Sequence, residues 1–109
     1  MALTPAVFHV LLALAGGESH GYGILKAVLE QTDGAVRLGP GTLYGTLQRL
    51  MEQGWVVESG KAIHVADERR RFYRLTPGGR SALEAEVGRM EALVRAARAQ
   101  NVRPKTARS

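Results

Sequence analysis

The stretch "LGPGTLYGTLQRLMEQGW", Leu38–Trp55, decides the fold because it predicts a helix with two very different sides. Gly39–Pro40 marks the start, since proline favours the first helical turn, and Gln53–Gly54 marks the end. One side is apolar at helical spacing and is expected to face the core: Leu43, Leu47 and Leu50. Gly45 lies on the other side, where glycine costs a helix about 1 kcal/mol relative to alanine. Helix propensity therefore does not explain why glycine occupies this position, and we look for the explanation in what lies against the helix.

The outer side of this helix has the chemistry of a surface that reads DNA. Threonine hydroxyl and methyl groups suit base edges, and arginine suits guanine or phosphate. Glutamine can reach adenine, a tyrosine hydroxyl can donate to phosphate, and a glycine leaves room for a groove wall. The alternative is an ordinary solvated face, which is less favoured because Glu and Lys are scarce on it. The candidate DNA-binding residues are Thr42, Tyr44, Gly45, Thr46, Gln48 and Arg49.

Capping and turn residues predict further elements on both sides of this helix. Two Thr-Pro pairs predict helix starts, because threonine caps a helix and proline favours its first turn. Ser19 is expected to cap the second helix. The expected elements are helices at 5–15, 20–32, 40–53 and 78–100, and strands at 35–38, 55–59 and 70–76. This order predicts an α+β, mainly helical protein with a winged helix-turn-helix and a C-terminal dimerisation helix.

The last two strands are expected to form a basic hairpin. Alternate residues of a strand face opposite ways, so three consecutive arginines cannot all have one role. We expect one of them to contact phosphate or a narrow minor groove, and another to lie along the surface of the domain. A solvated run of charges is the alternative. The candidate DNA-binding residues of the hairpin are Lys61, His64, Arg69, Arg70 and Arg71.

The last helix has an apolar stripe with alternating spacings of four and three residues. Such a stripe is typical of a helix that pairs with another helix, although core helices show the same pattern. We favour pairing with a second copy of the chain, because a helix that follows a wing projects from the core. The two DNA-contacting helices of such a dimer, one from each copy, would lie about 34–36 Å apart and would fit an inverted repeat. The candidate dimer residues are Leu83, Val87, Met90, Val94 and Ala97.

The net charge of +5 is distributed unevenly along the 109 residues. Residues 1–54 have three basic and four acidic side chains, whereas residues 55–109 have twelve basic and six acidic ones. The net charges of the two parts are therefore −1 and +6. Such a basic bias favours a polyanionic partner, either nucleic acid or an anionic membrane.

The sequence contains no motif that predicts an enzyme. Its three histidines, His9, His20 and His64, fall on different elements and have no paired carboxylates or phosphate-binding loop beside them. The chain has no cysteine, so disulfides and thiolate metal sites are excluded. Its longest apolar run is too short to span a bilayer. We therefore expect a cytoplasmic protein that has no catalytic activity, no metal and no cofactor.

Three motifs in this order resemble the PadR family of bacterial transcriptional regulators. They are "SHGYGI" at Ser19–Ile24, the stretch at Leu38–Trp55, and "ERRRFYRLTPGGRSALEAE" at Glu68–Glu86. The resemblance implies a winged helix-turn-helix dimer that usually acts as a repressor. It also implies that Tyr44 and its neighbours contact the operator and that the arginines before "FYRLT" lie on the wing.

The expected elements also predict how the chain is divided. Residues 1–76 are expected to form the DNA-binding domain, residues 77–100 the dimerisation helix, and residues 101–109 a disordered basic tail. The chain is similar to the short members of the family, which have no separate C-terminal domain for an effector. Release from DNA by a small-molecule effector is left open. The alternative function is a winged-helix module that binds RNA or protein.

Overall fold

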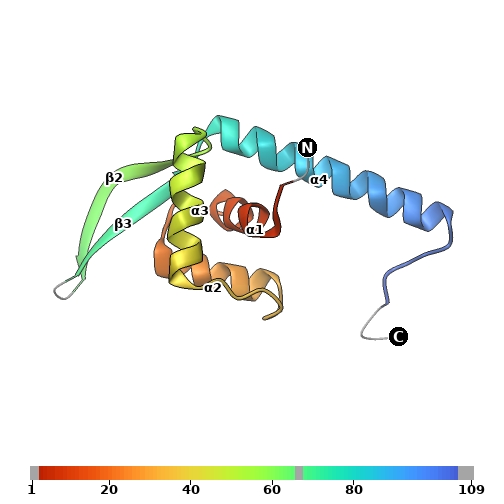
Figure 1. Ribbon diagram of the computed structural model, residues 1–109, viewed down its shortest axis with the longest axis horizontal. Helices are drawn as coiled ribbons and strands as arrows, with labels where there is room; N and C mark the ends of the chain where they lie inside the picture. The colour runs from red at the N-terminus through yellow and green to blue at the C-terminus, as the bar shows by residue number, and fades with distance from the viewer. Residues whose placement is uncertain (1–2, 66–67, 106–109) are drawn as a thin grey trace.

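The computed structural model describes residues 3–65 and 68–105, and it describes no side chains for residues 60–70. Within these residues the chain forms four helices and one three-stranded sheet (Figure 1). The elements are α1 (Pro5–Ala15), β1 (Ser19–His20), α2 (Gly21–Gln31), α3 (Pro40–Glu52), β2 (Val56–Val65), β3 (Glu68–Leu75) and α4 (Pro77–Ala99). This arrangement confirms the predicted class, a mainly helical winged helix-turn-helix.

The apolar helix α1 lies at the centre of the fold. It contacts α2, α3, α4 and β3, which explains why almost every side of it carries apolar residues. Thr4 caps α1 by accepting a hydrogen bond from Val7 N–H, as predicted for this Thr-Pro pair. The buried core joins residues from all of these elements: Val10, Leu11, Leu14, Ile24, Val28, Leu43, Leu47, Leu50, Val56, Tyr73 and Leu83.

The sheet corrects two predictions about short segments. The strand expected at 35–38 is absent, and Ser19–His20 forms β1 instead, pairing antiparallel with Tyr73 and Phe72 of β3. The segment 35–38 is held differently, because the Thr32 hydroxyl accepts a hydrogen bond from Val36 N–H at 3.1 Å. The cap of α2 is also one residue later than predicted: it is His20 and not Ser19, because α2 begins at Gly21, and His20 Nδ1 accepts a hydrogen bond from Gly23 N–H at 3.1 Å.

The hairpin of β2 and β3 is longer than the sequence predicted. Most of the expected loop is paired, with Ala62 opposite Arg71, and the register shifts between Glu58 and Ala62. At the base of the hairpin the side chain of Tyr73 is buried. Burial raises the pKa of this phenol, and the nearby Glu58 carboxylate raises it further. The base of the wing is therefore continuous with the core.

The junction between α3, the hairpin and α4 is closed by one backbone hydrogen bond and by two hydrogen bonds of the Thr76 side chain. Gly54 has a φ of 80°, which suits glycine, and the next N–H, that of Trp55, donates to Leu50 O at 2.9 Å. The Thr76 hydroxyl donates to Gly54 O at 2.7 Å and accepts from Gly79 N–H at 3.0 Å. The start of α4 is thereby fixed to the end of α3.

Helix α4 has three buried residues, Gly79, Leu83 and Glu86, all in its first half, and none in its second half. In the first half, the Glu86 carboxylate accepts two hydrogen bonds from Arg89, at 3.0 and 2.6 Å, and these bonds lower the pKa of Glu86. Leu83 is also buried in the core of its own domain, so its predicted place in a dimer contact is wrong. The second half extends away from the other elements (Figure 1), and the longest dimension of the whole protein is 54 Å. Among the described residues, no helix is long and apolar enough to cross a membrane.

Candidate nucleic-acid interface

The outer side of α3 is exposed, and its inner side is anchored by the three predicted leucines, which are buried. A side chain at Gly45 would meet only Arg49 Nη1, at 4.0 Å, so the space above this glycine is open. Tyr44 remains 51% exposed at one border of the open surface. Together with the half-buried Gly45, four exposed residues form a strip along α3, which we call the α3 strip: Thr42, Tyr44, Gly45, Gln48 and Arg49.

Thr46 does not belong to the α3 strip, although the sequence placed it there. Its side chain is fully buried, and its hydroxyl accepts a hydrogen bond of 3.5 Å from Arg49 Nη2. Each residue turns a helix by about 100°, so Thr46 projects only about 40° from Leu50 and lies on the core side. Its role is to hold Arg49 at the edge of the strip.

Tyr44 is held in place by a glycine at the start of the neighbouring helix. Its phenol lies against Gly21, the first residue of α2, and a Cβ at that position would collide with Tyr44 Oη. The ring atom Cζ would lie 3.0 Å from that Cβ. Because Gly21 has no side chain, the phenol of Tyr44 fits beside it. The sequence alone did not indicate this contact.

The wing begins beside this tyrosine, and one of its arginines has a partner. Arg71 Nε lies 3.4 Å from Glu58 Oε2 across the hairpin, and both side chains are substantially exposed. This arginine therefore lies along the surface of its own domain, as expected for one member of the run. The other candidates have described backbones in the hairpin, with His64 opposite Arg69, but their side chains lie outside the described residues: Lys61, His64, Arg69 and Arg70.

An exposed helix beside a hairpin, in this chain order, is what the three sequence motifs predicted. The family model of the transcriptional regulator PadR-like family matches residues 10–85, which span α2, α3 and the whole hairpin. The chain belongs to the PadR-like family. The resemblance inferred from the sequence is thereby confirmed, and transcriptional regulation is the activity of this family.

Two relatives show how far the likeness of this PadR-like protein extends. The transcriptional regulator Rv3488 of Mycobacterium tuberculosis (strain ATCC 25618 / H37Rv) is 40% identical over 88 residues, which cover 80% of this chain and 77% of Rv3488. An uncharacterized 37.1 kDa protein in transposon TN4556 of Streptomyces fradiae is 43% identical over 95 residues. That match covers 85% of this chain but only 25% of the Streptomyces protein, so the chain spans about a quarter of that relative.

Solved structures share the PadR-like fold. A transcriptional regulator from Clostridium thermocellum aligns with a TM-score of 0.69 at 27% identity, over 83% of this chain and 86% of its own. The structure of Bacillus subtilis PadR in complex with operator DNA aligns with a TM-score of 0.65 at 21% identity, over 74% of this chain and 45% of its own. At this low identity the second likeness concerns the fold alone.

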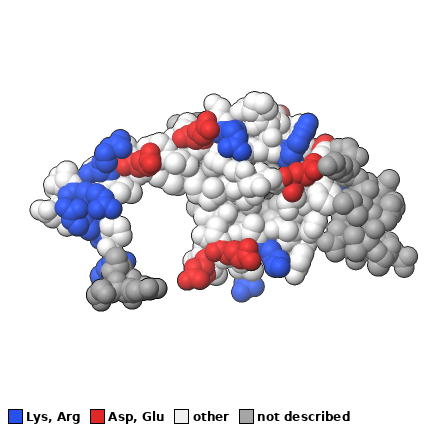
Figure 2. Space-filling model, turned by 180° about the vertical axis from the view of Figure 1, so that it is seen from behind, with Lys and Arg blue, Asp and Glu red and all other residues white. Residues whose placement is uncertain are grey.

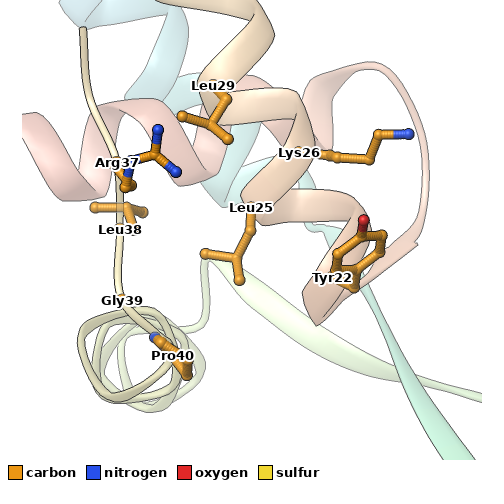
Figure 3. A pocket seen from close by; sticks show the side chains of 8 residues that line it. All are labelled: Tyr22, Leu25, Lys26, Leu29, Arg37, Leu38, Gly39 and Pro40. Atoms are coloured by element: carbon orange, nitrogen blue, oxygen red, sulfur yellow. The ribbon is translucent and has the colours of Figure 1, made fainter. Parts of the chain in front are cut away.

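A hollow next to α3 was not indicated by the sequence. It has a volume of about 420 Å³ and lies between α2 and the segment that leads into α3 (Figure 3). Figure 3 shows Leu25 pointing toward Pro40, with Arg37 and Lys26 on opposite sides. Two of the three basic residues among residues 1–54 therefore flank one surface depression. They come from different elements, so only the fold brings them together.

Charged residues are distributed differently on the opposite side of this PadR-like protein. Figure 2 shows basic side chains gathered at the free end of α4, whereas the middle of that face carries few charges. The basic residues at and after this end are exposed and include Arg95, Arg98, Arg103 and Lys105. Among the described side chains, no three His, Cys, Asp or Glu residues are close enough together to hold a metal ion.

Proposed function

We propose that this PadR-like protein is a homodimeric, sequence-specific DNA-binding repressor whose α3 reads an inverted-repeat operator. The observation that carries the proposal is the α3 strip, which is open at Gly45 and firmly anchored on its inner side. Its 13 residues give α3 a length of about 20 Å, which suits the major groove. In this proposal the α3 strip contacts bases and phosphates.

The proposed contact to the duplex also includes the wing. Arg71 is substantially exposed although it lies near Glu58, so a phosphate can compete for its guanidinium. The remaining wing candidates join the proposal on the grounds of charge and position in the hairpin: Lys61, His64, Arg69 and Arg70. An exposed ion pair contributes only about 0–1 kcal/mol, so the loss of the Glu58 contact is a small cost.

The dimer part of the proposal rests on the apolar stripe of α4 that begins at Val87. Val87 and Val94 are 39% and 46% exposed, and Leu93 beside them is 56% exposed, which leaves an apolar surface for a second copy. Met90 and Ala97 are half-buried along the same stripe. A small-molecule effector would act by changing how the two copies sit against each other.

Selection of bound fragments from the source genome tests the proposed function. The expected result is a set of duplexes with two half-sites whose centres lie one helical turn apart. Arg49→Ala should then weaken binding to selected duplexes by about tenfold, equivalent to about 1.4 kcal/mol, and should weaken binding to unrelated duplexes less. Equal losses on both duplexes would mean that Arg49 contacts phosphate only.

A winged-helix module that binds RNA or protein is the second candidate function, because it would use the same basic wing. A direct comparison of a selected duplex with a hairpin RNA of equal length separates the two. Stronger binding to the RNA at the same salt concentration would overturn the proposed operator function. The comparison must fix the salt concentration, because phosphate contacts make both affinities depend on it.

A further inference from the structure

The hollow beside α3 combines an apolar lining with two exposed cations. Its floor and walls are apolar, formed by half-buried leucines of α2 and of the segment before α3: Leu25, Leu29 and Leu38. Its sides carry the exposed cations Lys26 and Arg37. Neither cation forms an ion pair among the described residues.

We propose that this hollow holds one strand of the DNA sugar–phosphate backbone, with Lys26 and Arg37 each contacting a phosphate. This proposal rests on the proposed operator function and adds a contact site to it. A DNA strand alternates anionic phosphates with deoxyribose rings that expose carbon atoms. The apolar floor suits the sugar, and the two cations suit the phosphates on either side of it.

The position of the hollow supports this occupant. It is bounded by Gly39 and Pro40, where α3 begins, and by Tyr22 and Leu25 on α2. In a helix-turn-helix, the first residues of the second helix contact bases while the first helix crosses the backbone of the duplex. The hollow lies where these two helices meet, so a strand that flanks the groove passes across it. Tyr22 is 63% exposed at its edge and can pack against a sugar.

The alternative occupant with the same chemistry is a free nucleotide, which has one sugar and one phosphate. A free nucleotide would need only one of the two cations, because its phosphate is a single group. Figure 3 shows the side chains of Lys26 and Arg37 extending in different directions from the residues that line the hollow. Two cations that point apart match the successive phosphates of a continuous strand better than the single phosphate of a nucleotide.

The salt dependence of DNA binding tests the proposal. Lys26→Gln, Arg37→Gln and the double variant are compared with the wild-type protein on a selected duplex, by fluorescence anisotropy at several salt concentrations. Each lost phosphate contact should reduce the slope of log K against log salt by about 0.9, so the double variant should lose about twice as much. The preference for selected over unrelated duplexes should be unchanged, because these contacts read no bases.

Matched controls separate the possible outcomes. Arg95→Gln removes an exposed cation at the far end of α4 and should leave the slope unchanged. Unchanged slopes in the Lys26 and Arg37 variants, with wild-type binding intact, would overturn the proposal and leave the operator function standing. Failure of the wild-type protein to bind any duplex would instead overturn the operator function. Displacement of the duplex by thymidine 5′-monophosphate at an equal phosphate concentration would assign the hollow to a free nucleotide.

Discussion

At the scale of single residues, the pair formed by Tyr44 and Gly21 determines how the α3 strip is presented. The phenol of Tyr44 projects from α3 and ends against α2, so two helices fix its direction. A tyrosine fixed in this way needs no reordering when it meets a phosphate, which lowers the entropy cost of binding. Gly21 therefore acts as a positioning residue for Tyr44.

Gly21→Ala should reduce operator affinity without unfolding the protein. Alanine favours a helix over glycine by about 1 kcal/mol, while its Cβ displaces the end of the Tyr44 side chain. We expect a loss of about tenfold, because a hydrogen bond to a charged group is worth about 1.5 kcal/mol. Anisotropy titrations of Gly21→Ala, Tyr44→Ala and the double variant provide the measurement. Additive losses in the double variant would show that the two residues act separately.

The difference between Thr46 and its neighbours shows where sequence analysis of single residues reaches its limit. Gly45 and Arg49 were correctly placed on the outer side because they lie far from the leucines around the helix. Thr46 was misplaced because its polar hydroxyl was weighed above its position about 40° from Leu50, which puts this short side chain on the core side. The contacts of Tyr44 and the hollow between Lys26 and Arg37 join different elements, so no local pattern predicts them.

At the scale of the elements, strong local signals were sufficient to place the helices. Thr-Pro pairs and terminal glycines located α1, α3 and α4 within about two residues, because caps act within a single turn. The strand predicted at 35–38 was wrong because its composition fits a strand, but it pairs with none of the three described strands. β1 has only two residues, and its existence depends on the edge of β3, a contact distant in sequence.

The attachment of α4 gives a stability prediction with a matched control on the same helix. A Cβ at the buried Gly79 would collide with the backbone of Trp55 and lie 2.9 Å from Leu75 Cδ1. Because backbone cannot yield as a side chain does, Gly79→Ala should destabilise the protein by about 1–3 kcal/mol. Thermal unfolding followed by circular dichroism measures this change, at one protein concentration because association also affects the midpoint.

The control is Gly88→Ala, which lies on the exposed part of α4 with nothing near its Cβ. It should stabilise the protein by about 0.5–1 kcal/mol through helix propensity alone. If Gly79→Ala lowers the stability of the protein and Gly88→Ala raises it, the effect of packing is separated from the effect of helix propensity. A midpoint for Gly79→Ala equal to or above that of the wild-type protein would show that Trp55 can move away.

At the scale of the whole molecule, the proposed dimer depends on the apolar surface of α4. Val94→Glu places a charge on the stripe and should convert the dimer to a monomer in analytical ultracentrifugation, because a buried unpaired carboxylate is costly. Ala92→Glu adds the same charge to an exposed position about 160° away around the helix and should leave the dimer intact. If the Val94→Glu variant still sediments as a dimer, the two copies contact each other through another surface.

The length of α4 has a mechanical consequence for such a dimer. Twenty-three residues make a rod of about 35 Å, fixed at one end by Thr76 and Gly79. Tilting this rod by about 5° at its attachment moves its free end by roughly 3 Å, close to the rise of one base pair. In the proposed dimer, a ligand that tilts α4 at its attached end would therefore change the spacing of the two DNA-contacting helices by about one base pair.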